Sequence, residues 1–306
     1  RFALGLYAAV HFAQLTPWAA ELFSNAGVVA DASASPILHA FPNLLALHDG
    51  PGFVTALAGL ATVLSVLVAV GLRDRWAAVA LWYILACFLG RNPLILNPSL
   101  PHIGWLLLAH AAVPTSPRGS VDGRLRPDLA ASWHLPRPLF AAGWVVQCAA
   151  YAYSGATKLV SPSWLDGTAL RHILDNPLAR PSALRDLALT LPDAVFAAGT
   201  WGALGLELAF PLLACSLRTR PWAWLAMLGM HLGLLLFVDF ADLTMGMLVL
   251  QLFTFEPRWL QAIRWPTVGP SPQTSAAGTA PRPEACWGQA DSPKSTTIVT
   301  RVTIDS

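Results

Sequence analysis

The stretch FVTALAGLATVLSVLVAVGL, residues 53–72, decides the fold class of this chain. It contains neither a charged residue nor a proline, and it has the length of about 20 residues that an α-helix needs to cross the hydrocarbon layer of a bilayer. Such a run is long enough to cross a bilayer rather than fill a soluble core. The stretch therefore predicts a transmembrane helix.

The composition of the whole chain agrees with this prediction. Of 306 residues, 55% are apolar and 12% are charged, and the mean hydropathy is +0.53, whereas an ordinary soluble domain carries about 25% charged residues. These values exclude a disordered chain and disfavour a soluble enzyme. The net charge of +2 is too small to indicate a nucleic-acid partner. The cysteines lack a C-x-x-C spacing and the histidines lack a tight cluster, so no metal site is predicted.

Eight apolar stretches predict about eight transmembrane helices and hence an all-α polytopic bundle in a lipid bilayer. They run over residues 2–23, 53–72, 76–89, 94–113, 139–156, 194–215, 222–237 and 243–255. Two amphipathic segments, residues 161–173 and 182–191, predict short helices at the membrane surface. The membrane domain is expected over residues 1–265, and residues 266–306 form a polar tail whose composition predicts disorder.

The basic residues between these stretches predict the orientation of the chain. One set of alternate connections, together with the N-terminus, carries Arg1, Arg73, Arg75, Arg118, Arg124, Arg126, Arg137, Arg218, Arg220, Arg258 and Arg264, and the other set carries only Arg91, Lys158, Arg171, Arg180 and Arg185. Because positive charge is enriched in cytoplasmic loops, both termini are predicted to be cytoplasmic.

The end of the fifth stretch holds the clearest group of polar side chains at membrane depth. Tyr151, Ser154 and Lys158 are spaced i, i+3 and i+7 on one helix face, and Gly155 beside them allows close approach of a backbone or a flat ligand. Lys158 is either a snorkelling lysine at a helix end or a partly desolvated amine that acts as a general base. Asp166 either pairs with it or favours the start of a surface helix.

Other ionisable residues near the membrane have two interpretations as well. A hydrogen bond between Glu207 and His231, both in mid-span, would either stabilise the bundle or handle protons. Arg91 and Asn92 belong to an outward polar turn in which Arg91 can clamp an anion or a carboxylate.

Four further ionisable residues are expected to have no special role. His11 and His110 are expected to pack between helices, and Asp239 and Asp242 to be solvated beside a short outward turn.

The Lys158 segment resembles the HTTM family, the transmembrane module that includes vitamin K-dependent gamma-carboxylase. Its members carry a pattern close to Tyr-x-x-x-Gly-x-x-Lys-Leu followed by Trp-x-x-Gly, and the matching positions here are Tyr151, Gly155, Lys158, Leu159, Trp164 and Gly167. The segments around Glu207, His231 and residues 245–260 are similar to the closing helices of the family. The resemblance covers roughly residues 1 to 265.

This resemblance implies a quinol-dependent enzyme of the carboxylase or epoxidase type, with Lys158 as the base that deprotonates a reduced, vitamin K-like quinone. The family's histidine lies in an Asn-His-Ser-Tyr turn, and His102 is the residue that can replace it from a shifted position in residues 97–102. The residues that would bind the quinol or the substrate are Tyr151, Ser154, Gly155, Trp164, Asp166, Arg91 and Asn92. The expected location is the inner membrane of a bacterium.

Two other functions stay open at this point. The chain can be a non-enzymatic membrane factor that matures or exports a secreted peptide. Alternatively, it can be a small-solute transporter in which Glu207 and His231 form the proton-linked pair.

Overall fold

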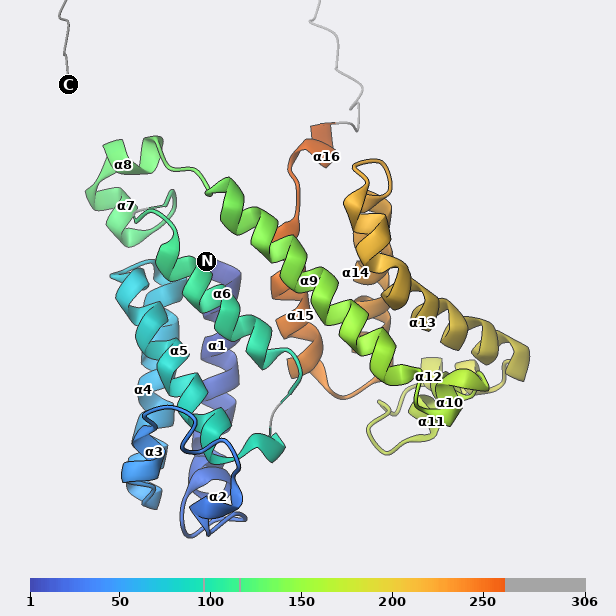
Figure 1. Cartoon of the computed structure of the whole chain (residues 1–306), viewed down its shortest axis with the longest axis horizontal. Coiled ribbons are helices and arrows are strands. Elements are labelled where there is room, and N and C mark those ends of the chain that lie inside the picture. The colour runs from blue at the N-terminus through green and yellow to red at the C-terminus, as the bar shows by residue number, and fades with distance from the viewer. Residues whose placement is uncertain (96, 116, 262–306) are drawn as a thin grey trace, which may run out of the picture. The chain divides into compact units, whose positions relative to one another are not determined.

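The computed structural model describes residues 1–95, 97–115 and 117–261. Within them the regular elements are helices, accompanied by one isolated antiparallel bridge between Ala179 and Val238 (Figure 1). The all-α prediction is therefore confirmed for these residues. The tail predicted over residues 266–306 lies outside the described part of the chain.

Each of the eight predicted apolar stretches overlaps one long helix. These are α1 (Phe2–Leu15), α4 (Pro51–Val70), α5 (Asp74–Arg91), α6 (Leu100–Ala112), α9 (Arg137–Lys158), α13 (Asp193–Cys215), α14 (Arg220–Phe237) and α15 (Ala241–Thr254). Two of them, α4 and α13, are long and apolar enough to cross a membrane on their own, while α6 and α15 are apolar but shorter. This supports an association of the protein with a membrane.

Prolines shorten two of the predicted helices. The first stretch breaks into α1, the 3-10 turn η1 (Thr16–Trp18) and α2 (Ala19–Phe23), because Pro17 has no N–H group for a helical hydrogen bond. The fourth stretch starts with the 3-10 turn η3 (Pro93–Ile95), and α6 begins only at Leu100, with Pro101 in its first turn. A polar turn therefore occupies the entrance to α6.

Short helices make up the connections. The predicted surface helix over residues 161–173 is two helices, α10 (Pro162–Leu165) and α11 (Ala169–Asp175), because Gly167 between them has a φ of 86° that ends a right-handed helix. The second predicted surface helix is α12 (Ala183–Leu189). The remaining short elements are η2 (Ala32–Ala34), α3 (Leu44–Leu47), α7 (Val121–Leu125), α8 (Pro127–Ala131) and α16 (Arg258–Gln261).

The long helices form two groups that α15 joins. In the first group α1 and α5 pack against α4, and α6 packs against α5; in the second group α9 and α14 pack against α13 (Figure 1). Helix α15 contacts α1 and α6 on one side and α9 and α14 on the other. The last turn of α9, the first turns of α6 and α15 and the end of α1 lie at the same end of the bundle, the lower end in Figure 1.

Apolar side chains also cover the outside of the bundle. On α4 the exposed residues include Leu60, Val63, Val66 and Val70, and on the second group they include Val145, Leu212 and Trp222. Apolar side chains exposed on several helices are what a lipid-facing surface requires, whereas water-facing surfaces rarely carry large apolar patches.

Candidate functional site

The amine of Lys158 forms an ion pair with the carboxylate of Glu207. Lys158 is the last residue of α9 and Glu207 lies in the middle of α13, and the lysine Nζ is 2.7 Å from Oε1 and 2.5 Å from Oε2. The side chain of Glu207 is 7% exposed and that of Lys158 is 20% exposed. Lys158 is thus the more exposed member of a largely buried pair.

Two more side chains surround the same amine. Ser154, one turn earlier on α9, accepts a hydrogen bond from Nζ over 2.7 Å. The Trp164 ring of α10 lies with its centroid 4.9 Å from Nζ, within the range of a cation–π contact. We call Ser154, Lys158, Trp164 and Glu207 the Lys158 cluster. An ammonium ion, a carboxylate, a hydroxyl group and an indole face therefore meet at the end of α9.

Gly155 explains how α13 reaches α9 so closely. A Cβ atom at this position would lie 2.9 Å from Cδ2 of Leu208 and 3.3 Å from Cβ of Glu207. The space that the sequence reserved for a backbone or a flat ligand is thus filled by α13. This contact positions the carboxylate of Glu207 beside Lys158.

Tyr151 and His231 form a second buried pair on the same side of α9. The tyrosine hydroxyl is 2.9 Å from Nε2 of His231, and both residues are buried. The Tyr151 ring also meets the Phe210 ring edge to face, with the centroids 4.7 Å apart. The hydrogen bond expected between Glu207 and His231 is therefore replaced by two others in the described residues. Each of the two side chains contacts a different residue of α9: Glu207 contacts Lys158, and His231 contacts Tyr151.

Asp166 lies outside the Lys158 cluster. It is exposed, and its Oδ1 accepts hydrogen bonds from the hydroxyl group and the backbone N–H of Thr168, over 2.6 and 2.9 Å. These hydrogen bonds lower the pKa of the Asp166 carboxyl below its ordinary value of 3.8. Asp166 thus stabilises the turn before α11. Of its two interpretations, the pairing with Lys158 is wrong.

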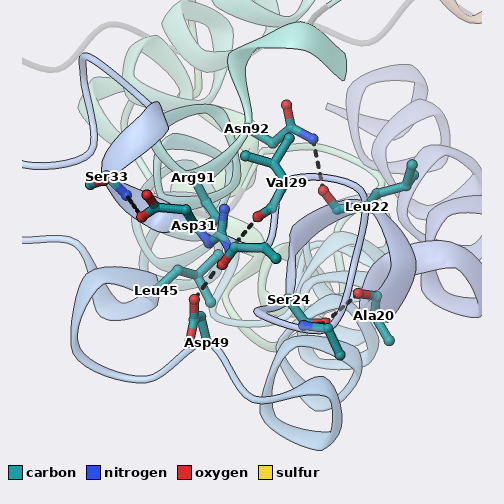
Figure 2. Close-up of polar contacts among 12 residues, drawn as sticks. Ala20, Leu22, Ser24, Val29, Asp31, Ser33, Leu45, Asp49, Arg91 and Asn92 are labelled. Carbon is teal, nitrogen blue, oxygen red and sulfur yellow. Dashed lines mark hydrogen bonds and ion pairs between the residues drawn. The ribbon is translucent and has the colours of Figure 1, made fainter.

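At the end of α5, Arg91 contacts the loop between α2 and α4, and Asn92 contacts α2, as Figure 2 shows. Nη2 of Arg91 donates to the carbonyl of Val29 over 2.8 Å and to Asp49 over 3.1 Å, and the arginine is fully buried. Nδ2 of Asn92 donates to the carbonyl of Leu22 over 2.7 Å. Arg91 clamps a carboxylate of its own chain, and a role of these two residues in binding a substrate stays a prediction.

His102 lies in the first turn of α6. Its Nδ1 is 3.1 Å from the carbonyl oxygen of Pro98, the residue one turn earlier. Within the described residues no hydrogen bond connects His102 to the Lys158 cluster. Its assignment as a catalytic residue stays a prediction from the resemblance.

Three of the residues expected to have no special role form contacts between a histidine and a carboxylate of another helix. Nδ1 of His11 on α1 is 3.0 Å from the carboxylate of Asp242 on α15, and His110 on α6 is 3.2 Å from the carboxylate of Asp74 on α5. Asp242 is therefore not a solvated turn residue. No local pattern identifies these partners, because His11 and Asp242 are 231 positions apart in the sequence.

The Lys158 cluster has the composition of a proton-transfer site. A lysine amine beside a buried carboxylate can exchange a proton with it, and a neutral amine can take a proton from a bound molecule. The chain matches no protein-family model, no curated protein and no solved structure. The resemblance to the HTTM family therefore rests on the sequence motif around Lys158.

Proposed function

We propose that this chain is a polytopic protein of the bacterial inner membrane whose long helices cross the bilayer with both termini in the cytoplasm. The apolar outer faces of α4 and of the α9 and α13 group support this arrangement, as does the basic content of alternate connections. The Lys158 cluster then lies toward the outer side of the membrane.

In this membrane frame, the protein is an enzyme that deprotonates a reduced quinone, with Lys158 as the base. The observation that carries the proposal is the contact of the Lys158 amine with the buried carboxylate of Glu207. The fit to a quinol comes from the donor set: the amine and the hydroxyl of Ser154 can meet a quinol hydroxyl, and the indole of Trp164 is a flat apolar surface for its ring.

The proton balance of this step assigns a separate task to Glu207. In the resting pair, the ammonium transfers a proton to the carboxylate and becomes a neutral amine. The amine would then take the proton of a quinol hydroxyl, and the ammonium of Lys158 would lie where the negative charge develops. Glu207 is neutral once it holds a proton, so it no longer competes for the ammonium. The positive charge of Lys158 is then available to stabilise the developing negative charge.

The experiment measures quinone epoxide in lipid nanodiscs that contain the purified protein, a reduced naphthoquinone and oxygen. The wild type is expected to form epoxide, and Lys158→Ala is expected to lose it. Lys158→Arg separates a base from a mere positive charge, because an arginine keeps the ion pair but does not give up its proton in proteins. We expect Lys158→Arg to remain folded and inactive.

A matched control comes from an exposed ion pair between α11 and α13, in the connection that follows Lys158. Arg171 contacts Asp193, with side chains that are 41% and 87% exposed, and Arg171→Ala is expected to keep the wild-type rate. An epoxide rate that Lys158→Ala leaves unchanged would remove the proposed function.

A further inference from the structure

A second polar cluster lies where α1, α6 and α15 meet. Tyr7 and His11 are one turn apart on α1, Asp242 lies in the first turn of α15, and Asn97 and Ser99 precede the first turn of α6. We call these five residues the His11 cluster. Neither α1 nor α15 carries a residue of the Lys158 cluster, so the inference below goes beyond the proposed function.

The centre of the His11 cluster is a histidine held by a carboxylate. Nδ1 of His11 is 3.0 Å from Oδ1 and 3.1 Å from Oδ2 of Asp242. The side chain of His11 is 15% exposed and that of Asp242 is 30% exposed. Nδ2 of Asn97 donates a second hydrogen bond to Oδ2 of Asp242. The carboxylate is therefore held by Asn97, from the turn before α6, and it contacts the ring of His11 on α1.

The amide of Asn97 is itself held in one orientation. Its Oδ1 accepts hydrogen bonds from the backbone N–H and the hydroxyl group of Ser99, each over 2.7 Å, and Ser99 is fully buried. Tyr7 lies beside it, with its hydroxyl 3.4 Å from Oγ of Ser99. Gly246 provides the space for this approach, because a Cβ atom there would lie 2.1 Å from Oγ of Ser99.

This arrangement determines which nitrogen of His11 is free. When the ring of His11 is neutral, its proton lies on Nδ1, because the carboxylate of Asp242 can only accept a hydrogen bond, and Nε2 is then an acceptor. Among the hydrogen bonds of the described residues none involves Nε2. His11 is thus an oriented acceptor for which the described residues provide no donor.

A cavity of about 470 Å³ lies along α1 and α15, and His11 is one of the residues that line it. Its polar wall includes Tyr7, His11 and Asp242, and most of the rest is apolar, with Leu6, Val10 and Leu248 among the lining residues. Cavities of this volume hold small organic ligands, which usually find apolar walls and a few oriented polar groups.

We propose that this cavity binds an apolar molecule with a hydroxyl head, and that the hydroxyl donates its hydrogen to Nε2 of His11. The charge of Asp242 disfavours a carboxylate head, and the ester-linked tails of bilayer lipids have no donor to offer. The hydroxyl can belong to a phenol or to a long-chain alcohol, since both present the same donor on an apolar body.

The test uses a photoreactive alkylphenol with a diazirine in its alkyl chain, bound to the full chain in phosphatidylcholine nanodiscs. Crosslinks mapped by mass spectrometry are expected on Met245 and Leu248, which line the cavity. Unlabelled decylphenol should displace the probe at a concentration about tenfold lower than its methyl ether, because the ether lacks the O–H that makes one hydrogen bond. A second arm compares dodecanol with its methyl ether. If the displacing concentrations differ for this pair and not for the phenol pair, the ligand is a long-chain alcohol.

The variant His11→Phe removes the acceptor and keeps a ring in its place. We expect the phenol and the ether to displace the probe at equal concentrations in this variant, and the ether to act as in the wild type, which shows that the cavity is intact. The matched control is His39→Phe, at an exposed histidine of the loop between α2 and α4, which should keep the tenfold preference.

Equal displacement by the hydroxyl compounds and their ethers in the wild type would overturn the proposal, since the cavity would then hold apolar chains only. A hydroxyl preference that survives in His11→Phe would overturn it as well. Because the readout is binding, this test can succeed or fail whether or not Lys158→Ala affects epoxide formation.

Discussion

Nζ of Lys158 lies 2.5 Å from Oε2 of Glu207, although the two residues are 49 positions apart and belong to different long helices. The contact joins the end of α9 to the middle of α13. Because the carboxylate is nearly buried, its charge depends on this partner for stabilisation. The pair is therefore a structural element of the second helix group as well as a candidate for chemistry.

The first prediction compares the loss of one charge of the pair between Lys158 and Glu207 with the loss of both charges. Lys158→Met leaves the carboxylate of Glu207 buried without a partner and should cost about 3–5 kcal/mol of unfolding free energy. The double variant Lys158→Met with Glu207→Gln removes both charges and should lose less. Thermal unfolding in detergent can be followed by the reaction of buried Cys87 with a fluorogenic maleimide, after the other cysteines are replaced by serine. A double variant less stable than Lys158→Met would contradict the prediction.

The second prediction concerns the close approach of α13 to α9. Gly155→Ala places a methyl group against Leu208 and should destabilise the protein by about 1–3 kcal/mol. Adding Leu208→Ala should recover part of the loss, because it removes the clashing atoms. The control is Gly202→Ala on the exposed side of α13, where a Cβ meets nothing within 4 Å and a helix is expected to gain about 0.5–1 kcal/mol. Equal effects of Gly155→Ala and Gly202→Ala would show that the helices are not in contact at Gly155.

The third prediction concerns the hydrogen bond between Tyr151 and His231. Tyr151→Phe leaves Nε2 of His231 buried without its partner, which should cost about 1–3 kcal/mol. Tyr153→Phe, at a neighbouring tyrosine that is 74% exposed, should leave the stability unchanged. The same maleimide assay measures both variants. An unchanged stability of the Tyr151→Phe variant would argue against the hydrogen bond between Tyr151 and His231.

The fourth prediction concerns the orientation of the chain. Thr190 follows α12 and Ser132 follows α8, and both residues are exposed. In a cysteine-free background, Thr190→Cys should react with an impermeant maleimide added to intact spheroplasts, whereas Ser132→Cys should react only after permeabilisation. Labelling of both cysteines from the same side would sink the proposed topology.

The fifth prediction concerns Asp166 and pH. Its pKa is lowered in the folded protein, so the stabilisation of the turn at Thr168 is present above the pKa of the unfolded chain and is lost as the pH falls through the folded pKa. Hydrogen exchange of the Thr168 amide should therefore speed up in acid beyond its intrinsic pH dependence. Asp166→Asn keeps an oxygen acceptor but does not titrate, and its exchange should lack this extra acid step.

Local patterns of the sequence were sufficient to predict the helices and the face on which Lys158 lies. The spacing of Tyr151, Ser154 and Lys158 fixes their common side once the helix forms, and the structure places Ser154 beside the amine as expected. The division of the predicted surface helix into α10 and α11 also has a local cause, Gly167. Only the φ of 86° in the structure shows that this glycine ends a helix.

The partners of these residues could not be predicted in the same way. Which residue meets Lys158 depends on the rotation and depth of α13, and these follow from how Leu208 packs over Gly155. The same holds for His11 and Asp242, since the composition of neither α1 nor α15 indicates which residues of the two helices come into contact. A pairing between distant helices needs the packed structure.

Among the long helices, the lengths of α6 and α15 have a consequence for the lipid around the protein. They contain 13 and 14 residues, which at about 1.5 Å per residue is roughly 20 Å, whereas the hydrocarbon layer is about 30 Å thick. In the proposed membrane arrangement, lipids beside these helices would have to compress to match them. In a bilayer, the headgroup region would therefore dip toward the His11 cluster, and thicker membranes would work against the fold on this side of the bundle more than on the side of α4.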